Sequence, residues 1–166
     1  KLDFVNTYAV TGSASVTLSG EKTISGRPFN AGDSFTFELY EANGSYAIGA
    51  TPKATADMNA STHKYEFVLN YGVSDVGNTY YYVIKEQNAG QTINGLTYST
   101  KEYNIKVEVI DNSGIVDTVV TVVDGTAEDK LDFVNTYAVT GSVNVTLSGE
   151  KTISGRPFNP GESFTF

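Results

Sequence analysis

The chain has 166 residues and a formal net charge of −8 at pH 7, and it contains neither cysteine nor tryptophan. The negative charge argues against nucleic acid and anionic membrane surfaces as partners, and the lack of cysteine excludes a disulfide or thiolate–metal framework. No run of about 18 apolar residues is present, so we expect no membrane insertion.

Alternation of apolar and polar residues predicts strands along most of the chain. They fall within residues 15–24, 34–39, 64–71, 79–86, 102–110, 116–123 and 131–137. Turn sequences, namely Asn43-Gly44, Asn94-Gly95 and Asn112-Ser113-Gly114, separate several of them. Residues 41–63 are weakly patterned and read as a long connection with room for one short edge strand or helical turn. No segment carries a sustained helical stripe, so the expected fold is an all-β antiparallel sandwich.

Residues 1–37 return almost unchanged as residues 130–166. The two copies differ only at Ala14/Val143, Ser15/Asn144, Ala31/Pro160 and Asp33/Glu162. The offset of 129 residues is too long for a solenoid unit and matches one whole globular domain. The sequence therefore predicts a window cut from a tandem array of domains joined head to tail.

The repeat also predicts domain boundaries. Residues 9–137 form the one complete domain, residues 1–8 are the last strand of a preceding repeat, and residues 138–166 hold the first strands of a following one. Only residues 138–142 separate the last strand of one repeat from the first strand of the next. Such a short linker predicts a semi-rigid array.

Three polar residues have the inward parity of their strands: Lys22, Glu86 and Asn135. Burying such side chains is costly unless they are paired, so we expect them to meet. A desolvated pocket favours a neutral lysine amine and a protonated glutamate. The amine could then attack the Asn135 carboxamide while Glu86 polarises its carbonyl and passes protons to the departing ammonia. The product would be a Lys22–Asn135 isopeptide bond, which needs no oxidant, metal or cofactor.

With these three residues in place, the chain resembles the isopeptide-forming repeat domains of Gram-positive pilins and surface adhesins, of the streptococcal pilin linker type. The matching motifs are V-T-L-S-G-E-K at 16–22, Y-Y-Y-V-I-K-E at 80–86, G-L-T-Y at 95–98 and F-V-N-T-Y at 133–137. The resemblance implies an Ig-like (CnaB-like) sandwich and an extracellular, cell-wall-anchored protein. It also implies that Lys22 is joined to Asn135 on a parallel neighbouring strand, assisted by Glu86.

Other interpretations compete with this one. Lys22 could lie along the surface with its amine in water, or a bulge at Gly20 could reverse the register of its strand. Glu38 is a rival for the assisting acid, although its parity places it toward solvent.

Asn6 and Lys151 are the equivalents of Asn135 and Lys22 in the neighbouring repeats and lack their partners in this window. We do not expect Asn6 to react with Lys22, because a parallel strand pair needs a crossover of a dozen or more residues, usually structured. The Asn6 strand of one molecule could instead dock beside the Lys151 strand of another.

The leading functional hypothesis is a structural stalk repeat of a bacterial pilus or adhesin, with identical repeats, and further copies in a filament, as its partners. Its cross-link would form in a single autocatalytic event, so the domain is not a turnover enzyme. The alternative is a module that binds a host protein or glycan through outward tyrosines such as Tyr81. A hydrolase is disfavoured, because the chain has a single histidine and no Ser-His-Asp order.

Overall fold

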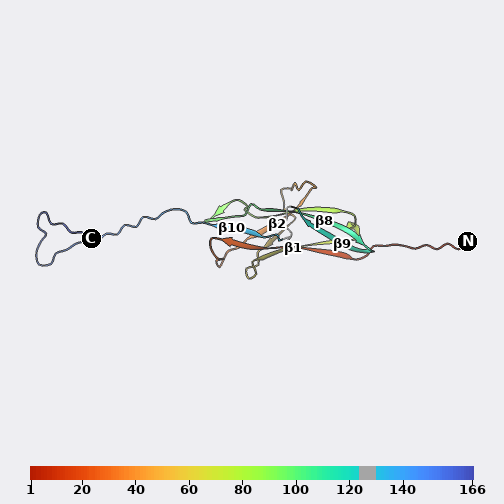
Figure 1. The fold of residues 1–166 in the computed structure, drawn as a ribbon, viewed down its shortest axis with the longest axis horizontal. Helices are drawn as coiled ribbons and strands as arrows, with labels where there is room; N and C mark the ends of the chain where they lie inside the picture. Colours follow the sequence, from red (N-terminus) through yellow and green to blue (C-terminus); the bar gives the residue numbers. More distant parts are fainter. Residues whose placement is uncertain (124–129) are drawn as a thin grey trace.

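The computed structural model describes residues 1–123 and 130–166, and these build two five-stranded sheets that pack against each other (Figure 1). The strands are β1 (Ser13–Ser25), β2 (Thr36–Ala42), β3 (Ala54–Asp57), β4 (Lys64–Gly72), β5 (Thr79–Glu86), β6 (Thr92–Ile93), β7 (Leu96–Thr97), β8 (Glu102–Asn112), β9 (Ile115–Val122) and β10 (Phe133–Tyr137). A short 3-10 helix, η1 (Val73–Asp75), follows β4.

One sheet has the strand order β4-β1-β10-β7-β6 and the other the order β3-β2-β5-β8-β9. Every pairing between named strands is antiparallel except that of β1 with β10, which is parallel. The first sheet is therefore mixed rather than purely antiparallel. The pair joins the first strand of the fold to the last, with Lys22 opposite Phe133 and Ile24 opposite Asn135.

The core lies between the sheets and is filled by the inward residues of each alternating strand. In β4 every second side chain is buried, from Tyr65 to Tyr71. Phe37 of the facing sheet stacks on Tyr65 at a ring-centroid distance of 3.9 Å, and Phe133 lies 5.2 Å from Phe37. Burying each such side chain stabilises the fold by roughly 1.5–3 kcal/mol. The period-two pattern of the sequence thus becomes one aromatic core beside the strand pair β1–β10.

Each strand predicted from alternation is present, and the weakly patterned residues 41–63 contain the edge strand β3. Two predicted turns form two-residue hairpin loops with positive φ at both positions. The φ angles are 51° and 79° at Asn94 and Gly95, and 55° and 90° at Ser113 and Gly114. These turns set the register of β6–β7 and β8–β9.

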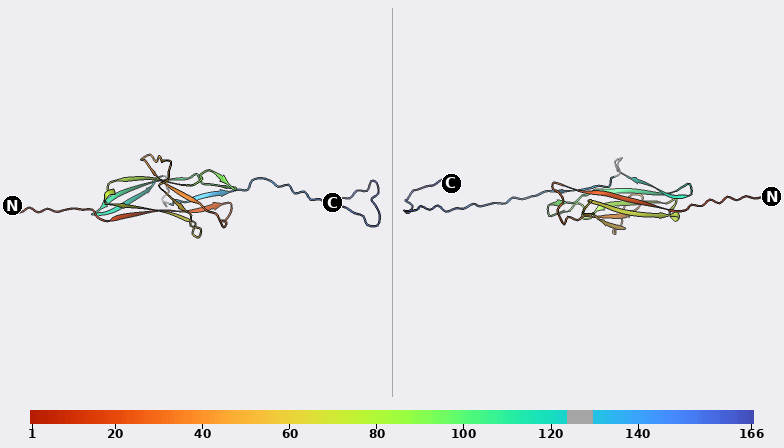
Figure 2. Two further views of the ribbon diagram at one scale, coloured as in Figure 1. Left: turned by 180° about the vertical axis from the view of Figure 1, so that it is seen from behind. Right: turned by 90° about the horizontal axis from the view of Figure 1, so that it is seen from below.

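Residues 1–8 and 138–166, here called the terminal segments, lie outside the two sheets. They leave the domain at opposite ends of its long axis in every view (Figures 1 and 2). Their apolar side chains are exposed, for example 89% for Phe4 and 91% for Leu147. Neither of the two sheets covers these apolar side chains.

Candidate functional site

Lys22, Glu86 and Asn135 are the buried polar or charged residues among those that the structure describes, with 0%, 1% and 0% exposure. The inward orientation predicted from strand parity is confirmed for each of them. Burial of a lysine, a glutamate and an asparagine together is unusual, because such groups lose their hydration unless they interact with one another. The three side chains define the candidate site.

The fold brings these residues together from three strands. Lys22 lies on β1 and Asn135 on β10, and the parallel register places them two positions apart on the same face of the sheet. Glu86 ends β5 in the opposite sheet, where it pairs with Phe37 of β2. The long lysine side chain spans the two-residue offset, and the glutamate reaches across the core to both partners.

One carboxylate oxygen of Glu86 bridges the other two groups. Its Oε1 lies 2.8 Å from Lys22 Nζ and accepts a 2.9 Å hydrogen bond from Asn135 Nδ2. Lys22 Nζ is at ion-pair distance, but the geometry of this contact is not that of a hydrogen bond, and Nζ has no hydrogen-bond partner among the described residues. The amine is therefore held close to the amide and the acid with its hydrogen bonding incomplete.

Burial changes the proton affinity of the amine. Desolvation lowers the pKa of Lys22 to about 8, and the attraction of the nearby Glu86 carboxylate opposes this lowering only in part. Roughly a tenth of such amines are neutral at pH 7, and half are neutral at pH 8. The ring of Phe35 lies 4.9 Å from Nζ and forms part of the apolar wall. A neutral amine is a nucleophile, so an amine held in such a pocket is chemically able to attack a carbonyl.

The backbone N–H of Ser99 is the group that sequence reasoning missed. It donates a 2.8 Å hydrogen bond to Asn135 Oδ1 and a longer one, 3.1 Å, to Glu86 Oε2. The Asn135 carbonyl thus faces the backbone donor, whereas the expectation from sequence was that Glu86 polarises it. Glu86 instead faces the amide nitrogen. No side-chain pattern could have revealed Ser99, because the donor is a main-chain group placed by the segment between β7 and β8.

The structure decides between the competing interpretations. Register is unbroken through Gly20, which lies opposite Tyr65, so the bulge alternative is wrong. The position of Gly20 leaves no room for a side chain, because a Cβ atom there would lie 2.0 Å from the Leu131 carbonyl oxygen. Complete burial of Lys22 excludes the surface position for its amine. Glu38 lies opposite Lys85 and accepts a hydrogen bond from the Tyr40 hydroxyl, away from Lys22.

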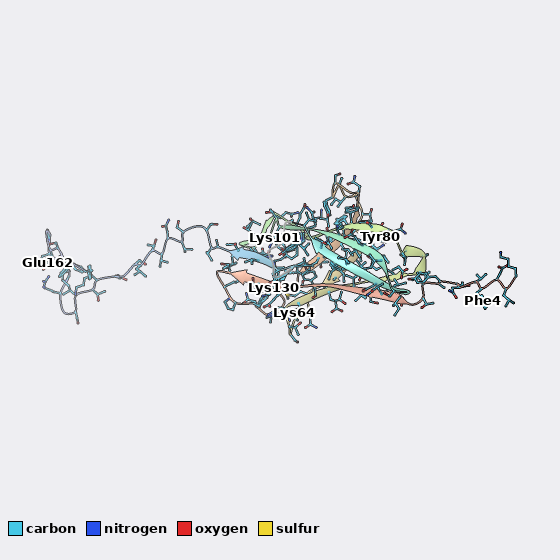
Figure 3. All side chains as sticks on the ribbon, turned by 45° about the vertical axis from the view of Figure 1, so that its right-hand side comes forward. Phe4, Lys64, Tyr80, Lys101, Lys130 and Glu162 are labelled. Carbon is cyan, nitrogen blue, oxygen red and sulfur yellow. The ribbon has the colours of Figure 1, made fainter. Side chains whose placement is uncertain are left out.

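Asn6 and Lys151 are exposed in the terminal segments and are not brought to the site. Figure 3 shows these segments on opposite sides of the sheets, marked by Phe4 and Glu162. Tyr81, expected to face outward, is half-buried and packs edge-on against Tyr46. No helix in the described ranges, 1–123 and 130–166, has the length and apolar character needed to cross a membrane.

Among solved structures, the chain is similar to a major pilin protein from Streptococcus pyogenes, with 21% identity and a TM-score of 0.43 over 81% of this chain and 56% of that one. A second major pilin of Streptococcus pyogenes shows 15% identity and a TM-score of 0.41 over 75% and 50% of the two chains. The chain thus spans about half the length of these pilins. The comparison with curated proteins gave no match.

The comparison with protein families is more specific. Residues 18–138 match the model of the FctA family, described as the Spy0128-like isopeptide containing domain. The matched range begins just before Lys22 and ends just after Asn135, so it contains all three buried polar residues. This chain belongs to the FctA family of Spy0128-like isopeptide containing domains.

Proposed function

We propose that the chain carries a structural repeat of the shaft of a Gram-positive cell-surface pilus or adhesin. Residues 9–137 would fold as an Ig-like (CnaB-like) sandwich stabilised by an intramolecular isopeptide bond between Lys22 and Asn135. The observation that supports this most directly is the contact of Glu86 Oε1 with both Lys22 Nζ and Asn135 Nδ2 inside the core.

The arrangement of the groups supports the following reaction. Neutral Lys22 attacks Asn135 Cγ through Nζ, and a C–N bond forms as the carbonyl oxygen gains negative charge. The Ser99 N–H faces that oxygen and can stabilise the charge, as an oxyanion hole does. Glu86 takes a proton from Nζ and delivers one to Nδ2, because its Oε1 adjoins both nitrogens. The Cγ–Nδ2 bond then breaks and one ammonia leaves, so atoms and charge balance without an oxidant or metal.

The position of the bond suits a protein under tension. The terminal segments leave the domain at opposite ends, so a pull on the chain enters at β1 and leaves from β10 (Figure 1). These strands are parallel neighbours, and a bond from Lys22 to Asn135 would connect them directly. Residues 23–134 would then be bypassed by the load.

The bond would also stabilise the fold thermodynamically. Lys22 and Asn135 are 113 positions apart in the sequence. Closing a loop of this length removes conformational entropy from the unfolded chain and contributes roughly 5 kcal/mol by the chain-entropy relation derived for disulfides. The chain has no cysteine with which to obtain the same effect from a disulfide.

The near-identity of residues 1–37 and 130–166 supports a head-to-tail array as the wider architecture. In this array Asn6 would be linked to a lysine of the preceding repeat and Lys151 to an asparagine of the following one. Adjacent repeats would be the partners of the domain. The exposed apolar residues of the terminal segments fit this arrangement, because complete neighbouring domains would cover them.

An intact mass of the purified chain tests the proposal. We expect a deficit of one ammonia and a branched peptide joining Lys22 to Asn135 after digestion. Asn135→Ala should restore the full sequence mass, whereas Asn6→Ala, the matched control in the terminal segment, should leave the deficit unchanged. Recovery of Lys22 and Asn135 in separate unmodified peptides would refute the cross-link.

A further inference from the structure

Tyr8, at the end of the N-terminal segment, is attached to the domain by its hydroxyl group alone. The hydroxyl donates a 2.6 Å hydrogen bond to Asp111 Oδ2 at the β8–β9 turn. The side chain is otherwise open to solvent, with 68% exposure. A tyrosine held by its tip leaves both faces of the ring free for another contact.

The residues after Tyr8 are also docked on the β8–β9 hairpin. Thr11 donates its backbone N–H to the Gly114 carbonyl at 2.9 Å and accepts from the Val116 N–H at 3.1 Å. Val10 packs on the hydrophobic core. The chain therefore joins its domain from Tyr8 onward, before β1 begins.

At the other end of the domain, Tyr137 is held by its ring rather than by its hydroxyl group. The guanidinium of Arg27 lies over the Tyr137 ring, 5.0 Å from its centroid, and is fixed by two hydrogen bonds to Asp33. Gly95 also adjoins the ring, since a Cβ there would lie 3.2 Å from a ring carbon, and the Gly95 carbonyl accepts a 2.9 Å hydrogen bond from the Ala138 N–H. The Tyr137 hydroxyl has no hydrogen-bond partner among the described residues.

Tyr8 and Tyr137 occupy the same position of the repeat, because residues 1–12 and 130–141 are identical in sequence. The contacts of the two tyrosines therefore describe two sides of one repeat position. From this juxtaposition we infer that Tyr137 is the joint between successive repeats: its ring lies against Arg27 and Gly95 of its own repeat, and its hydroxyl bonds the Asp111 carboxylate of the next. The partner is a second copy of this repeat, and the inference rests on the tandem array proposed above.

The inferred joint leaves no freely rotating linker. Ala138 is tied to the preceding repeat through Gly95. Val139 is the equivalent of Val10 and would pack against the hydrophobic core of the following repeat. Thr140 is the equivalent of Thr11 and would hydrogen-bond the backbone of Gly114 and Val116 in that repeat. Ala138, Val139 and Thr140 thus each contact one domain or the other. Successive repeats are held at a defined angle, and the array behaves as a stiff rod.

A two-repeat protein, residues 1–137 followed directly by residues 9–166, reproduces the junction without foreign sequence. The chain has no cysteine, so Ser61→Cys in each repeat provides two unique spin-label sites in an exposed loop. Pulsed electron paramagnetic resonance spectroscopy then measures the distribution of distances between the two spin labels, one in each repeat. We expect one narrow distribution. Tyr137→Phe at the junction keeps the ring but removes the hydroxyl. It should raise several-fold the fraction of molecules whose label-to-label distance falls outside the narrow peak.

Matched variants separate the joint from general damage. Tyr8→Phe removes the same hydroxyl where no repeat precedes it, and should leave the distribution unchanged. Asp111→Ala in the second repeat should broaden it, and the same change in the first repeat should not. A broad distribution in the unaltered protein, or a width that Tyr137→Phe does not alter, would overturn the joint. The intact mass is measured on the same samples. A mass equal to the full sequence mass would refute the isopeptide proposal. A mass lowered by the loss of ammonia, together with a broad distance distribution, would refute the joint alone.

Discussion

Asn135 lies two positions out of register with Lys22 on the neighbouring parallel strand, and a single oxygen of Glu86 contacts the side-chain nitrogens of both. The offset matters because a lysine side chain is much longer than an asparagine side chain. Direct opposition would carry the amine beyond the amide, whereas the offset lets it lie along the sheet and end there. The geometry therefore depends on the register of β1 and β10.

The rate of cross-linking should rise with pH. The pKa of Lys22 is lowered to about 8 by burial, and only the neutral amine attacks. Below pH 8 the neutral fraction, and with it the rate, should fall about tenfold per pH unit. The rate should level off above pH 8, where most of the Lys22 amine is already neutral. Ammonia loss followed by mass spectrometry after refolding measures this, and a rate independent of pH between 6 and 8 would contradict it.

Glu86→Gln should fold and remain unlinked. Glutamine has nearly the same shape but cannot relay a proton from Lys22 to Asn135. The variant should keep its ammonia and lose roughly 5 kcal/mol of stability with the closed loop. Intact mass and denaturant unfolding measure the two effects. Glu38→Ala is the control, because Glu38 bonds Tyr40 and not the site. Normal cross-linking in the glutamine variant would rule out the proton relay.

Gly20→Ala should destabilise the domain and slow the reaction. The new methyl group would lie 2.0 Å from the Leu131 carbonyl oxygen and 2.9 Å from the Tyr65 ring. Backbone near β10 must move to admit it, at a cost of about 1–3 kcal/mol. Gly149 is the matched control at the equivalent repeat position, because a methyl group added there would have no atom within 4 Å. Equal melting temperatures for Gly20→Ala and Gly149→Ala would show that the contact is unimportant.

Removing the Ser99 N–H should slow cross-linking. Ser99→Pro deletes the donor to Asn135 Oδ1, and loss of one oxyanion donor typically costs on the order of 10²-fold in rate. Ser99→Ala keeps the N–H and should react normally. Circular dichroism establishes that the proline variant is folded before its rate of ammonia loss is compared. Equal rates in a folded proline variant would exclude the backbone donor from the mechanism.

Under force, the linked domain should not unfold. Tension passing along β1 to Lys22 would cross to Asn135 and bypass the segment between them. In single-molecule stretching we expect no extension step from the unaltered domain. The Glu86→Gln variant should give one step, from the release of that segment. A step of the same length in both proteins would show that the bond does not shield the fold.

Much of the site was predictable from the sequence, because strand parity has a period of two and needs no tertiary information. Lys22, Glu86 and Asn135 each share the parity of buried neighbours, and each is buried. The contact of the Ser99 N–H with Asn135 was not predictable, because every residue type except proline carries a backbone N–H. Nor could parity show which end of the Asn135 amide faces Glu86, since that depends on the donor opposite it.

The repeated segments separate local from tertiary effects within one molecule. The turn after the first strand forms in both copies: Arg27 bonds Asp33 with Asn30 N–H beside it, and Arg156 bonds Glu162 with Asn159 N–H in the same way. This turn needs only its own sequence, because its hydrogen bonds join residues at most six positions apart.

The lysine-bearing strand behaves differently. Residues 16–25 and 145–154 are identical, yet the first copy lies in a sheet with Lys22 fully buried, and the second copy forms no strand and leaves Lys151 exposed. A strand obtains its hydrogen bonds from neighbours distant in the sequence, here β4 and β10. The sequence by itself determined which residues could face a core and how the turns close. The tertiary structure decided which of two identical lysines meets its acid and its amide.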